Sequence, residues 1–282
     1  MNFRNGKKTG EGASSDIRLI MSSLAVLLLL AICLFGEHFL PHDPYLVDMG
    51  NAFLPPCRDY IFGTDNLGRC VMCRIIAGGK TSVFVALGVV FVVMILGTLI
   101  GVIAGFAGGI LDNALMKVTL VFQAFPAFVL AIAIGAILGT GIIAGMIALI
   151  AVYWTTYARL SRSMILAYKN DNYIKAARLY GASPSAIVFK YVLPNTLGVM
   201  AVTAALDVGN VILSMAGLSF IGLGAARPTA EWGAVMNEAS AYFQTAPWII
   251  MFNGITLFLA VIVFNLFGDS LRDKLDSKRI NK

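Results

Sequence analysis

The sequence has few charged residues. Asp, Glu, Lys and Arg make up 13% of its 282 residues, whereas a typical soluble domain has about 25%. Hydrophobic residues make up 59%, so the composition predicts a chain whose bulk lies in a lipid bilayer. The formal net charge of +6 does not indicate a nucleic-acid partner, because an excess of Lys and Arg in a membrane protein usually reports its orientation.

Residues that support catalysis or a disulfide framework are also scarce. The sequence has two histidines, and it contains no serine–histidine–acid set, HExxH motif or paired carboxylates. Its four cysteines are too few and too irregularly spaced for a disulfide framework. We therefore expect that the chain is not an enzyme.

A nucleotide-binding loop is missing as well. Gly79-Lys80-Thr81 resembles the end of a phosphate-binding loop, but that motif needs a glycine where Arg74 stands. We therefore expect no ATP hydrolysis by this chain and no cofactor bound to it.

Six apolar segments are long enough to cross a bilayer, so the sequence predicts an all-α membrane protein with six transmembrane helices. For the first segment a signal peptide is the alternative. The residues that follow it, Glu37–Pro41, offer no small-residue cleavage site, which favours a retained anchor. The expected spans are residues 19–35, 82–106, 115–138, 142–157, 197–223 and 248–267.

The distribution of Lys and Arg indicates the orientation. With six spans both termini lie on one side of the membrane. The five basic residues that fall on the opposite side are Arg58, Arg69, Arg74, Lys80 and Arg227, which leaves 16 of the 21 on the side of the termini. By the positive-inside rule, the N-terminus, the C-terminus and residues 172–195 are cytoplasmic.

Small residues recur within the spans. Gly97, Gly101 and Gly105 lie four residues apart in the second span, a spacing that lets helix backbones approach closely in lipid. Pro126 interrupts the third span and, with Gln123, predicts a kinked stretch that lines a cavity; a simple packing kink is the alternative.

Two polar residues fall about midway along the fifth span. Asp207 is ionisable, and Asn210 follows it by three residues. An ionisable group at this depth is a candidate for the translocation path. A helix–helix hydrogen bond inside the bundle is an equally good interpretation.

A polar segment, residues 37–81, separates the first two spans. Within it residues 67–76 have helical spacing and predict a helix lying along the membrane surface. Cys70 and Cys73, with Cys57 nearby, have the chemistry to bind a soft metal. Two cysteines alone fall short of a closed site, so we expect them to be small apolar residues of that helix, without a metal.

Residues 172–195 form a polar, basic island between apolar segments. Gly181 is expected to end a short helix in the left-handed conformation. Ser183 is expected to cap a second helix, with Pro184 at its first position, and Leu193-Pro194 to end it. The result is a helix–turn–helix between the fourth and fifth spans, which predicts a docking surface for another protein.

The island resembles the EAA loop of the inner-membrane permease subunits of ATP-binding-cassette (ABC) importers. Three further motifs resemble the second permease of the dipeptide/oligopeptide/nickel importer family: FGTDNLGR (62–69), GLSFIGLGAARPTAEWG (217–233) and FNLFGDSLRDKLD (264–276). The sequence departs from the family pattern at three positions. Lys175 occupies a position where the family usually has an acidic residue, Tyr191 one where it has a histidine, and Cys70 one where it has an aspartate.

The resemblance implies the type I ABC importer permease fold and a division of the chain. Residues 1–18 and 270–282 would be cytoplasmic tails, residues 19–79 the first helix with its extracytoplasmic loop, and residues 80–269 the permease domain. The residues carried over to the ATPase-coupling loop are Tyr173, Ala176, Ala177, Arg178, Gly181, Ala182, Ser183, Ile187, Leu193 and Pro194.

The resemblance also implies partners and cargo. A second permease, two ABC ATPase subunits that bind ATP and Mg, and an extracytoplasmic substrate-binding protein would assemble with this chain in the lipid of the cell (inner) membrane. Small peptides and nickel or metal chelates are nearly tied as cargo. A stand-alone channel or secondary carrier is the alternative function, and a membrane-embedded enzyme is the third.

Overall fold

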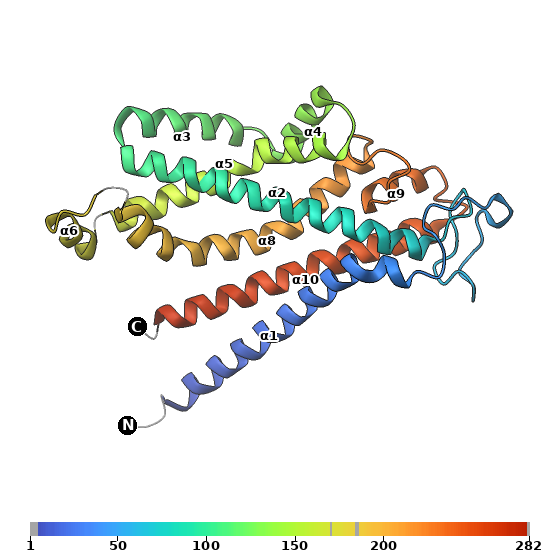
Figure 1. The fold of residues 1–282 in the computed structure, drawn as a ribbon, viewed down its shortest axis with the longest axis horizontal. Coiled ribbons are helices and arrows are strands. Elements are labelled where there is room, and N and C mark those ends of the chain that lie inside the picture. Colours follow the sequence, from blue (N-terminus) through green and yellow to red (C-terminus); the bar gives the residue numbers. More distant parts are fainter. Residues whose placement is uncertain (1–4, 170, 184–185, 281–282) are drawn as a thin grey trace.

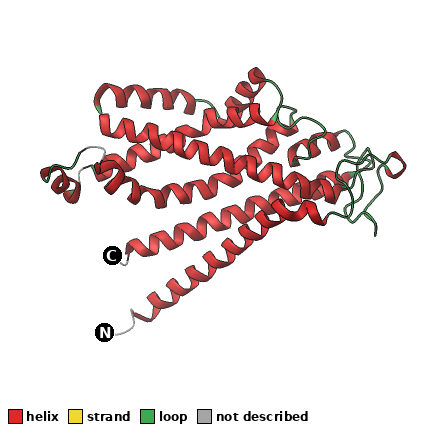
Figure 2. Ribbon diagram, viewed as in Figure 1, coloured by secondary structure: helices red, strands yellow, loops and turns green. Residues whose placement is uncertain are grey.

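Helices that run along one long axis build the fold (Figure 1). The structure is a computed structural model and describes residues 5–169, 171–183 and 186–280. Helices and loops make up this part of the chain (Figure 2), apart from one isolated β-bridge. The elements are α1 (Asn5–Phe35), η1 (Gly36–Phe39), η2 (Met49–Asn51), α2 (Val71–Ala107), α3 (Gly109–Gln123), α4 (Ala127–Leu138), α5 (Ile142–Tyr168), α6 (Asn172–Leu179), η3 (Ile187–Val192), α8 (Leu193–Phe220), α9 (Trp232–Ser240) and α10 (Pro247–Ile280).

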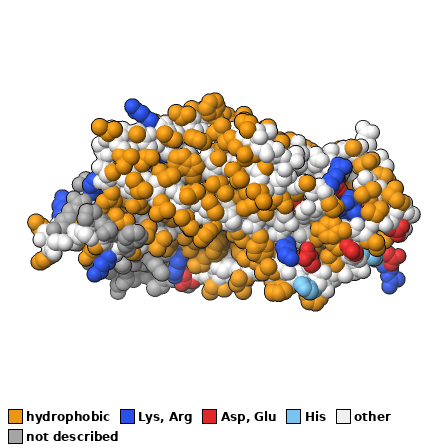
Figure 3. Space-filling view, turned by 45° about the horizontal axis from the view of Figure 1, so that its top comes forward, with side chains coloured by type: hydrophobic (Ala, Val, Ile, Leu, Met, Phe, Trp, Pro, Cys, Tyr) orange, Lys and Arg blue, Asp and Glu red, His pale blue; other side chains and the backbone are white. Residues whose placement is uncertain are grey.

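Five of these helices are long and apolar enough to cross a membrane: α1, α2, α5, α8 and α10. The pair α3 and α4 passes the same test together, with a bend of 89° between the two helices. The face drawn in Figure 3 is hydrophobic over the middle of the bundle and carries its charged side chains mainly toward the two ends. This distribution is the one expected for a bundle surrounded by lipid.

The path of the chain supports counting α3 and α4 as one crossing. In Figure 1, α2 ends at the left of the bundle and α5 begins toward the right, so the bent pair covers the distance between them. Both termini then lie at the same end of the molecule as α6, and the segment between α1 and α2 lies at the other end (Figure 1). The expected all-α fold is confirmed.

The break between α3 and α4 is sharper than the expected kink. Helix α3 ends at Gln123, and Pro126 precedes α4 with an extended ψ of 123°. Proline has no N–H to donate and disfavours helical conformation at the residue before it. The chain therefore forms two helices here rather than one bent helix.

The first turns of α2 differ from a second expectation of the sequence analysis. The stretch containing Cys70 and Cys73 was expected to form a separate helix on the membrane surface, and that expectation is wrong. Cys70 caps α2, and the following residues are the first turns of the same continuous 37-residue helix that crosses the membrane. Arg74 of this segment is fully buried and faces a polar cluster within the protein rather than the membrane surface.

The three glycines of α2 lie against α5, as their spacing predicted. A Cβ atom added at Gly97 would lie 2.6 Å from Cβ of Tyr157, and one added at Gly105 would lie 2.8 Å from Cγ2 of Ile165. Between them, Gly101 faces the Ala158 carbonyl and the Ser161 hydroxyl. The two backbones therefore approach so closely that no larger side chain fits along this seam.

Replacing the central glycine tests this packing. Gly101→Leu forces a side chain into the α2–α5 seam, and we expect the free energy of unfolding to fall by about 1–3 kcal/mol or more. Thermal unfolding of the detergent-solubilised protein measures the change. Gly254→Leu is the matched control, because a Cβ at that glycine of α10 meets nothing within 4 Å. Equal stability of the two variants would contradict a tight seam.

Candidate functional site

The first helix of the polar island ends as its sequence predicted. Gly181 has φ +82°, the left-handed conformation that glycine adopts without strain. The N–H of Ala182 donates to the carbonyl of Ala177 at 3.0 Å, which is the long hydrogen bond of a Schellman motif. The turn that follows α6 is therefore specified locally by this glycine.

The second half of the island begins with the expected cap. The Ser183 hydroxyl accepts a hydrogen bond from the N–H of Ala186 at 3.2 Å, three residues later, as an N-cap residue does. Pro184, the expected first helical residue, lies outside the described residues.

The expectation that Leu193-Pro194 ends this second helix is wrong. The π-helical segment η3 runs directly into α8, and Pro194 lies in the first turn of α8. The N–H of Leu193 donates to the carbonyl of Val188, five residues earlier, instead of to the residue four earlier. The wider π-turn gives the proline ring room that an α-turn lacks, so the helix continues through the proline.

Apolar contacts hold the island to the bundle. Ile174 of α6 and Ile187 and Val192 of η3 are almost completely buried in one cluster with Ile165 of α5. Partly buried side chains of α2, Val102 and Phe106, pack against this cluster together with Tyr168, Ala182 and Tyr191. Residues 172–192 are therefore attached to the ends of both α2 and α5.

The opposite side of the island is open. Leu179 is 89% exposed and Tyr180 is 92% exposed, although both are large and apolar or aromatic. Tyr173 is also exposed, and Ala176 is half-buried. The side chain of Arg178 lies outside the part of the chain that is described. In Figure 1, α6 projects beyond the ends of the long helices.

The candidates for the translocation path fall into two sets. Asp207 lies beside the phenol of Tyr157 on α5, and the amide of Asn210 donates to Asp207 at 3.5 Å. Gln123 instead accepts a hydrogen bond from the guanidinium of Arg159. Because Tyr157 and Arg159 are two residues apart on α5, their side chains point to nearly opposite faces of that helix.

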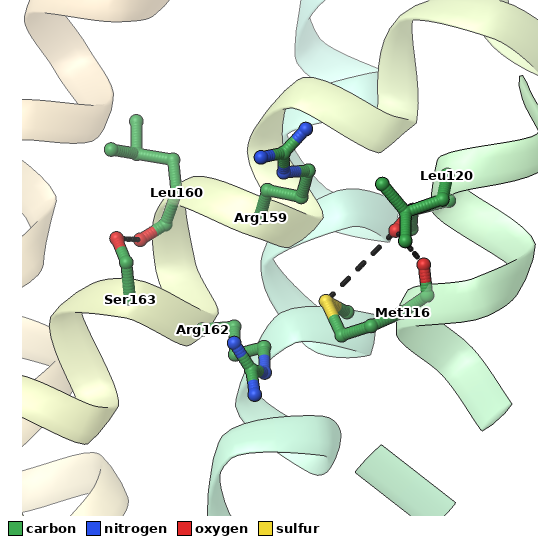
Figure 4. Close-up of a pocket in the computed structure, with 7 residues that line it drawn as sticks. Met116, Leu120, Arg159, Leu160, Arg162 and Ser163 are labelled. Carbon is green, nitrogen blue, oxygen red and sulfur yellow. Dashed lines mark hydrogen bonds between the residues drawn. The ribbon is translucent and has the colours of Figure 1, made fainter. Parts of the chain in front are cut away.

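The face of α5 that carries Arg159 borders a pocket of about 520 Å³. Figure 4 shows that Arg159 and Arg162 of α5 lie across this space from Met116 and Leu120 of α3. Arg162 is held there by two bonds to Asp112, at 2.5 Å and 2.7 Å. The pocket therefore has two arginines on its α5 side, one of them paired with Asp112, and Met116, Thr119 and Leu120 on its α3 side.

A buried cluster of charges lies at the opposite end of the molecule. Arg69 pairs with Asp65 at 2.7 Å and with Glu238 of α9 at 2.5 Å. Arg74 of α2 reaches the same carboxylates, at 3.1 Å to Glu238 and 3.6 Å to Asp65. Sequence analysis missed this cluster, because Glu238 belongs to no motif and lies far from the others along the chain.

A second set of hydrogen bonds joins the same elements. Ser82 of α2 donates to Glu231 at 3.0 Å and accepts from the N–H of Trp232 at 3.1 Å. The indole N–H of Trp232 donates to the carbonyl of Ile75. The motif at 217–233 is therefore hydrogen-bonded to the first turns of α2, the helix that directly follows the motif at 62–69.

Cys70 and Cys73 lie together at the first turn of α2, and both are buried. The N–H of Cys73 donates to the sulfur of Cys70 at 3.5 Å. Hydrogen bonding from the Cys73 thiol lowers the pKa of the Cys70 thiol. Cys57 is exposed. It lies in the segment between α1 and α2, residues 36–70, which we call the outer segment.

Comparison with known proteins gives this architecture a family. The model of the family "Binding-protein-dependent transport system inner membrane component" matches residues 97–281. A chain of the MetNI methionine ABC transporter, solved in an inward-facing crystal form, superposes with a TM-score of 0.54 at 20% identity, over 71% of this chain and 96% of that one. At that identity the likeness shows the fold alone.

Several relatives are much more similar in sequence. The nickel transport system permease protein NikC of Escherichia coli (strain K12) is 36% identical over 93% of this chain and 94% of its own length. The probable D,D-dipeptide transport system permease protein DdpC of the same strain is 36% identical over 92% of this chain and 87% of its own length.

The glutathione transport system permease protein GsiD of Escherichia coli O6:K15:H31 (strain 536 / UPEC) is 39% identical over 91% of this chain and 85% of its own length. These matches run through the whole bundle, including the outer segment and the island at residues 172–195. The chain therefore belongs to the inner-membrane permeases of binding-protein-dependent ABC importers, in the group that contains peptide and nickel permeases.

Proposed function

We propose that this chain is one of two permease subunits of an ABC importer and that separate ATPase subunits move it by gripping residues 172–192. The observation that carries the proposal is the two-sided structure of this element. One side is buried in an apolar cluster at the ends of α2 and α5, and the other presents Leu179 and Tyr180 to the outside.

The mechanism follows from these two sides. A large apolar side chain exposed on a rigid turn is the kind of anchor that fills a pocket on a partner protein. A push on Leu179 and Tyr180 passes through Ile174 and Ile187 to Ile165, and so to α5. Because η3 continues into α8, the same push also moves α8. Tilting α5 and α8 together would open the path alternately to the two sides of the membrane.

This mechanism requires the island to lie in the cytoplasm, where ATPase subunits are found. Both termini share its end of the molecule (Figure 1), and the excess of Lys and Arg on that side favours the cytoplasm. The chain would then present its buried charge cluster and α9 to the extracytoplasmic side, toward a substrate-binding protein.

A second permease subunit would complete the translocation path. Asn210 is exposed on the membrane-spanning helix α8, and Arg159 is exposed on α5 two residues beyond the expected span. A polar side chain within the membrane is expected to face protein or a water-filled cavity. We therefore infer that the face of α8 that carries Asn210 is covered by the partner permease or lines the path.

The relatives divide between two kinds of cargo. NikC is named for nickel transport, whereas DdpC and GsiD are named for D,D-dipeptide and glutathione transport. Their identities to this chain lie within a few per cent of one another, so we propose small peptides or nickel as the cargo. Direct measurement of uptake separates the two.

The turn after α6 provides a test of coupling. Gly181→Leu forces a residue with a side chain into the left-handed conformation, at a cost of about 1–2 kcal/mol, and Ala177→Asp places a carboxylate at a buried position of α6. We expect both variants to insert into the membrane and to lose uptake by the assembled importer. Gly139→Leu is the matched control, since it has φ +89° and open surroundings but lies outside the island. Normal uptake by both coupling variants would contradict the proposal.

The exposed leucine gives a sharper test, because its replacement removes no internal packing. We expect Leu179→Asp to leave the stability of the permease unchanged but to reduce uptake and co-purification of the ATPase subunits about tenfold or more. Leu46→Asp, at an exposed leucine of the outer segment (65% exposed), should change neither quantity. Undiminished recovery of ATPase subunits with Leu179→Asp would show that the ATPase subunits bind a different surface of the permease.

Uptake by cells that express the complete importer tests the proposed function and identifies the cargo. We expect labelled nickel, dipeptide or glutathione to accumulate only when the ATPase subunits are active, because this chain has no motif for using ATP. The label that accumulates identifies the cargo. Accumulation with catalytically inactive ATPase subunits would instead indicate a channel or secondary carrier.

A further inference from the structure

We propose that His42, Cys70 and Cys73 bind a thiophilic divalent cation, with Zn²⁺ as the best-fitting ion, and that this ion fastens the outer segment to the start of α2. The three potential ligand atoms, one ring nitrogen and two sulfurs, all lie within 4.8 Å of one another. His42 precedes Cys70 by 28 residues and Cys73 by 31 residues. The fold, and not the local sequence, therefore brings the histidine to the cysteines.

The distances suit a metal ion. With Zn–S bonds of about 2.3 Å and Zn–N bonds of about 2.0–2.1 Å, the ligand atoms of a tetrahedral site lie roughly 3.5–3.8 Å apart. The observed ligand atoms all lie within 4.8 Å of one another, so they are about 1 Å from the spacing of a tetrahedral zinc site.

The environment of the His42 ring is the observation that favours a bound metal most directly. Its Nδ1 atom is buried and has no hydrogen-bond partner among the described residues. Its ring stacks on Tyr60, with centroids 4.7 Å apart and an angle of 21° between the planes. A buried ring nitrogen without a partner costs free energy, and a metal bond would satisfy it while the stacked tyrosine fixes the orientation of the ring.

The cysteines are arranged to act together. Cys70 is the N-cap of α2 and Cys73 lies three residues later, a spacing that puts both sulfurs on one side of the first turn. They are 2% and 0% exposed, respectively. The N–H of Cys73 donates to the sulfur of Cys70, the type of supporting hydrogen bond that orients metal-bound thiolates.

The ligand set selects the class of ion. Thiolate and imidazole ligands suit zinc and related ions, whereas Mg²⁺ and Ca²⁺ need oxygen ligands. Two cysteines and one histidine leave the fourth position of a tetrahedral Zn²⁺ open to water or another donor. A Cys70–Cys73 disulfide is the competing use of these thiols, but it would leave the buried nitrogen of His42 unsatisfied.

Such an ion would hold the segment between α1 and α2 against the first turn of α2. It would join residue 42, in the segment between α1 and α2, to the turn that also carries Arg69 and precedes Arg74. Those two arginines bind Glu238 of α9. The metal would therefore stabilise the same junction that the buried charge cluster holds, whatever the cargo of the importer.

Metal binding by the full chain in the purified importer tests the proposal. After treatment with a reductant and a chelator, we expect one Zn²⁺ per chain to bind, and Co²⁺ in its place to show thiolate-to-metal charge-transfer absorption. Cys70→Ser and Cys73→Ser should lose the bound ion, and His42→Ala should bind it about tenfold more weakly or worse. Cys57→Ser, at the exposed cysteine of the same segment, should bind normally.

A second measurement keeps the test independent of folding. In the wild-type protein Zn²⁺ should slow alkylation of Cys70 and Cys73, and in His42→Ala, which retains both thiols, this protection should be lost. The proposal is overturned by the absence of stoichiometric Zn²⁺, by unchanged binding in the Cys70→Ser/Cys73→Ser double variant, or by loss of binding in Cys57→Ser. Recovery of a Cys70–Cys73 disulfide from cells in place of the ion would also overturn it.

Discussion

The close approach of α2 to α5 is the contact on which the remaining architecture depends. Three glycines of α2 let its backbone lie against α5, and the last of them, Gly105, faces Ile165. Ile165 is also the residue of α5 that packs against Ile174 and Ile187 of the polar island at residues 172–195. This close helix–helix contact thus ends where the island is attached to both helices.

The other end of the bundle is held by different forces. There Asp65, Arg69, Arg74 and Glu238 form a buried cluster that joins the outer segment, α2 and α9. Buried ion pairs often add little net stability, because desolvation offsets their attraction. Their geometry, however, permits few alternative arrangements, so the cluster fixes how the outer segment sits on the helices. The molecule therefore has a buried, ion-paired junction at one end and an attached, exposed element at the opposite end.

The sequence predicted the features that depend on short-range chemistry. The positive φ of Gly181, the cap at Ser183 and the small-residue seam of α2 follow from the properties of single residues or of residues one turn apart. The features that it missed depend on context. Nothing local shows that a π-turn carries η3 through Pro194. Similarly, Glu238 and His42 come to the first turns of α2 only through the path of the chain, as no periodicity relates them to Cys70 or Arg74.

Helix α5 carries polar side chains on two nearly opposite faces. Tyr157 faces inward and lies beside Asp207, whereas Arg159, two residues later, points to the opposite face and contacts Gln123 at the end of α3. Tyr157 lies within the expected span, where a polar side chain cannot face lipid without a large cost. One face is satisfied by α8 of the same chain, and the other is closed in part by α3. Helix α3 ends at the break before Pro126, and α4, which follows that break, also packs against α5, so both halves of the bent pair contact α5.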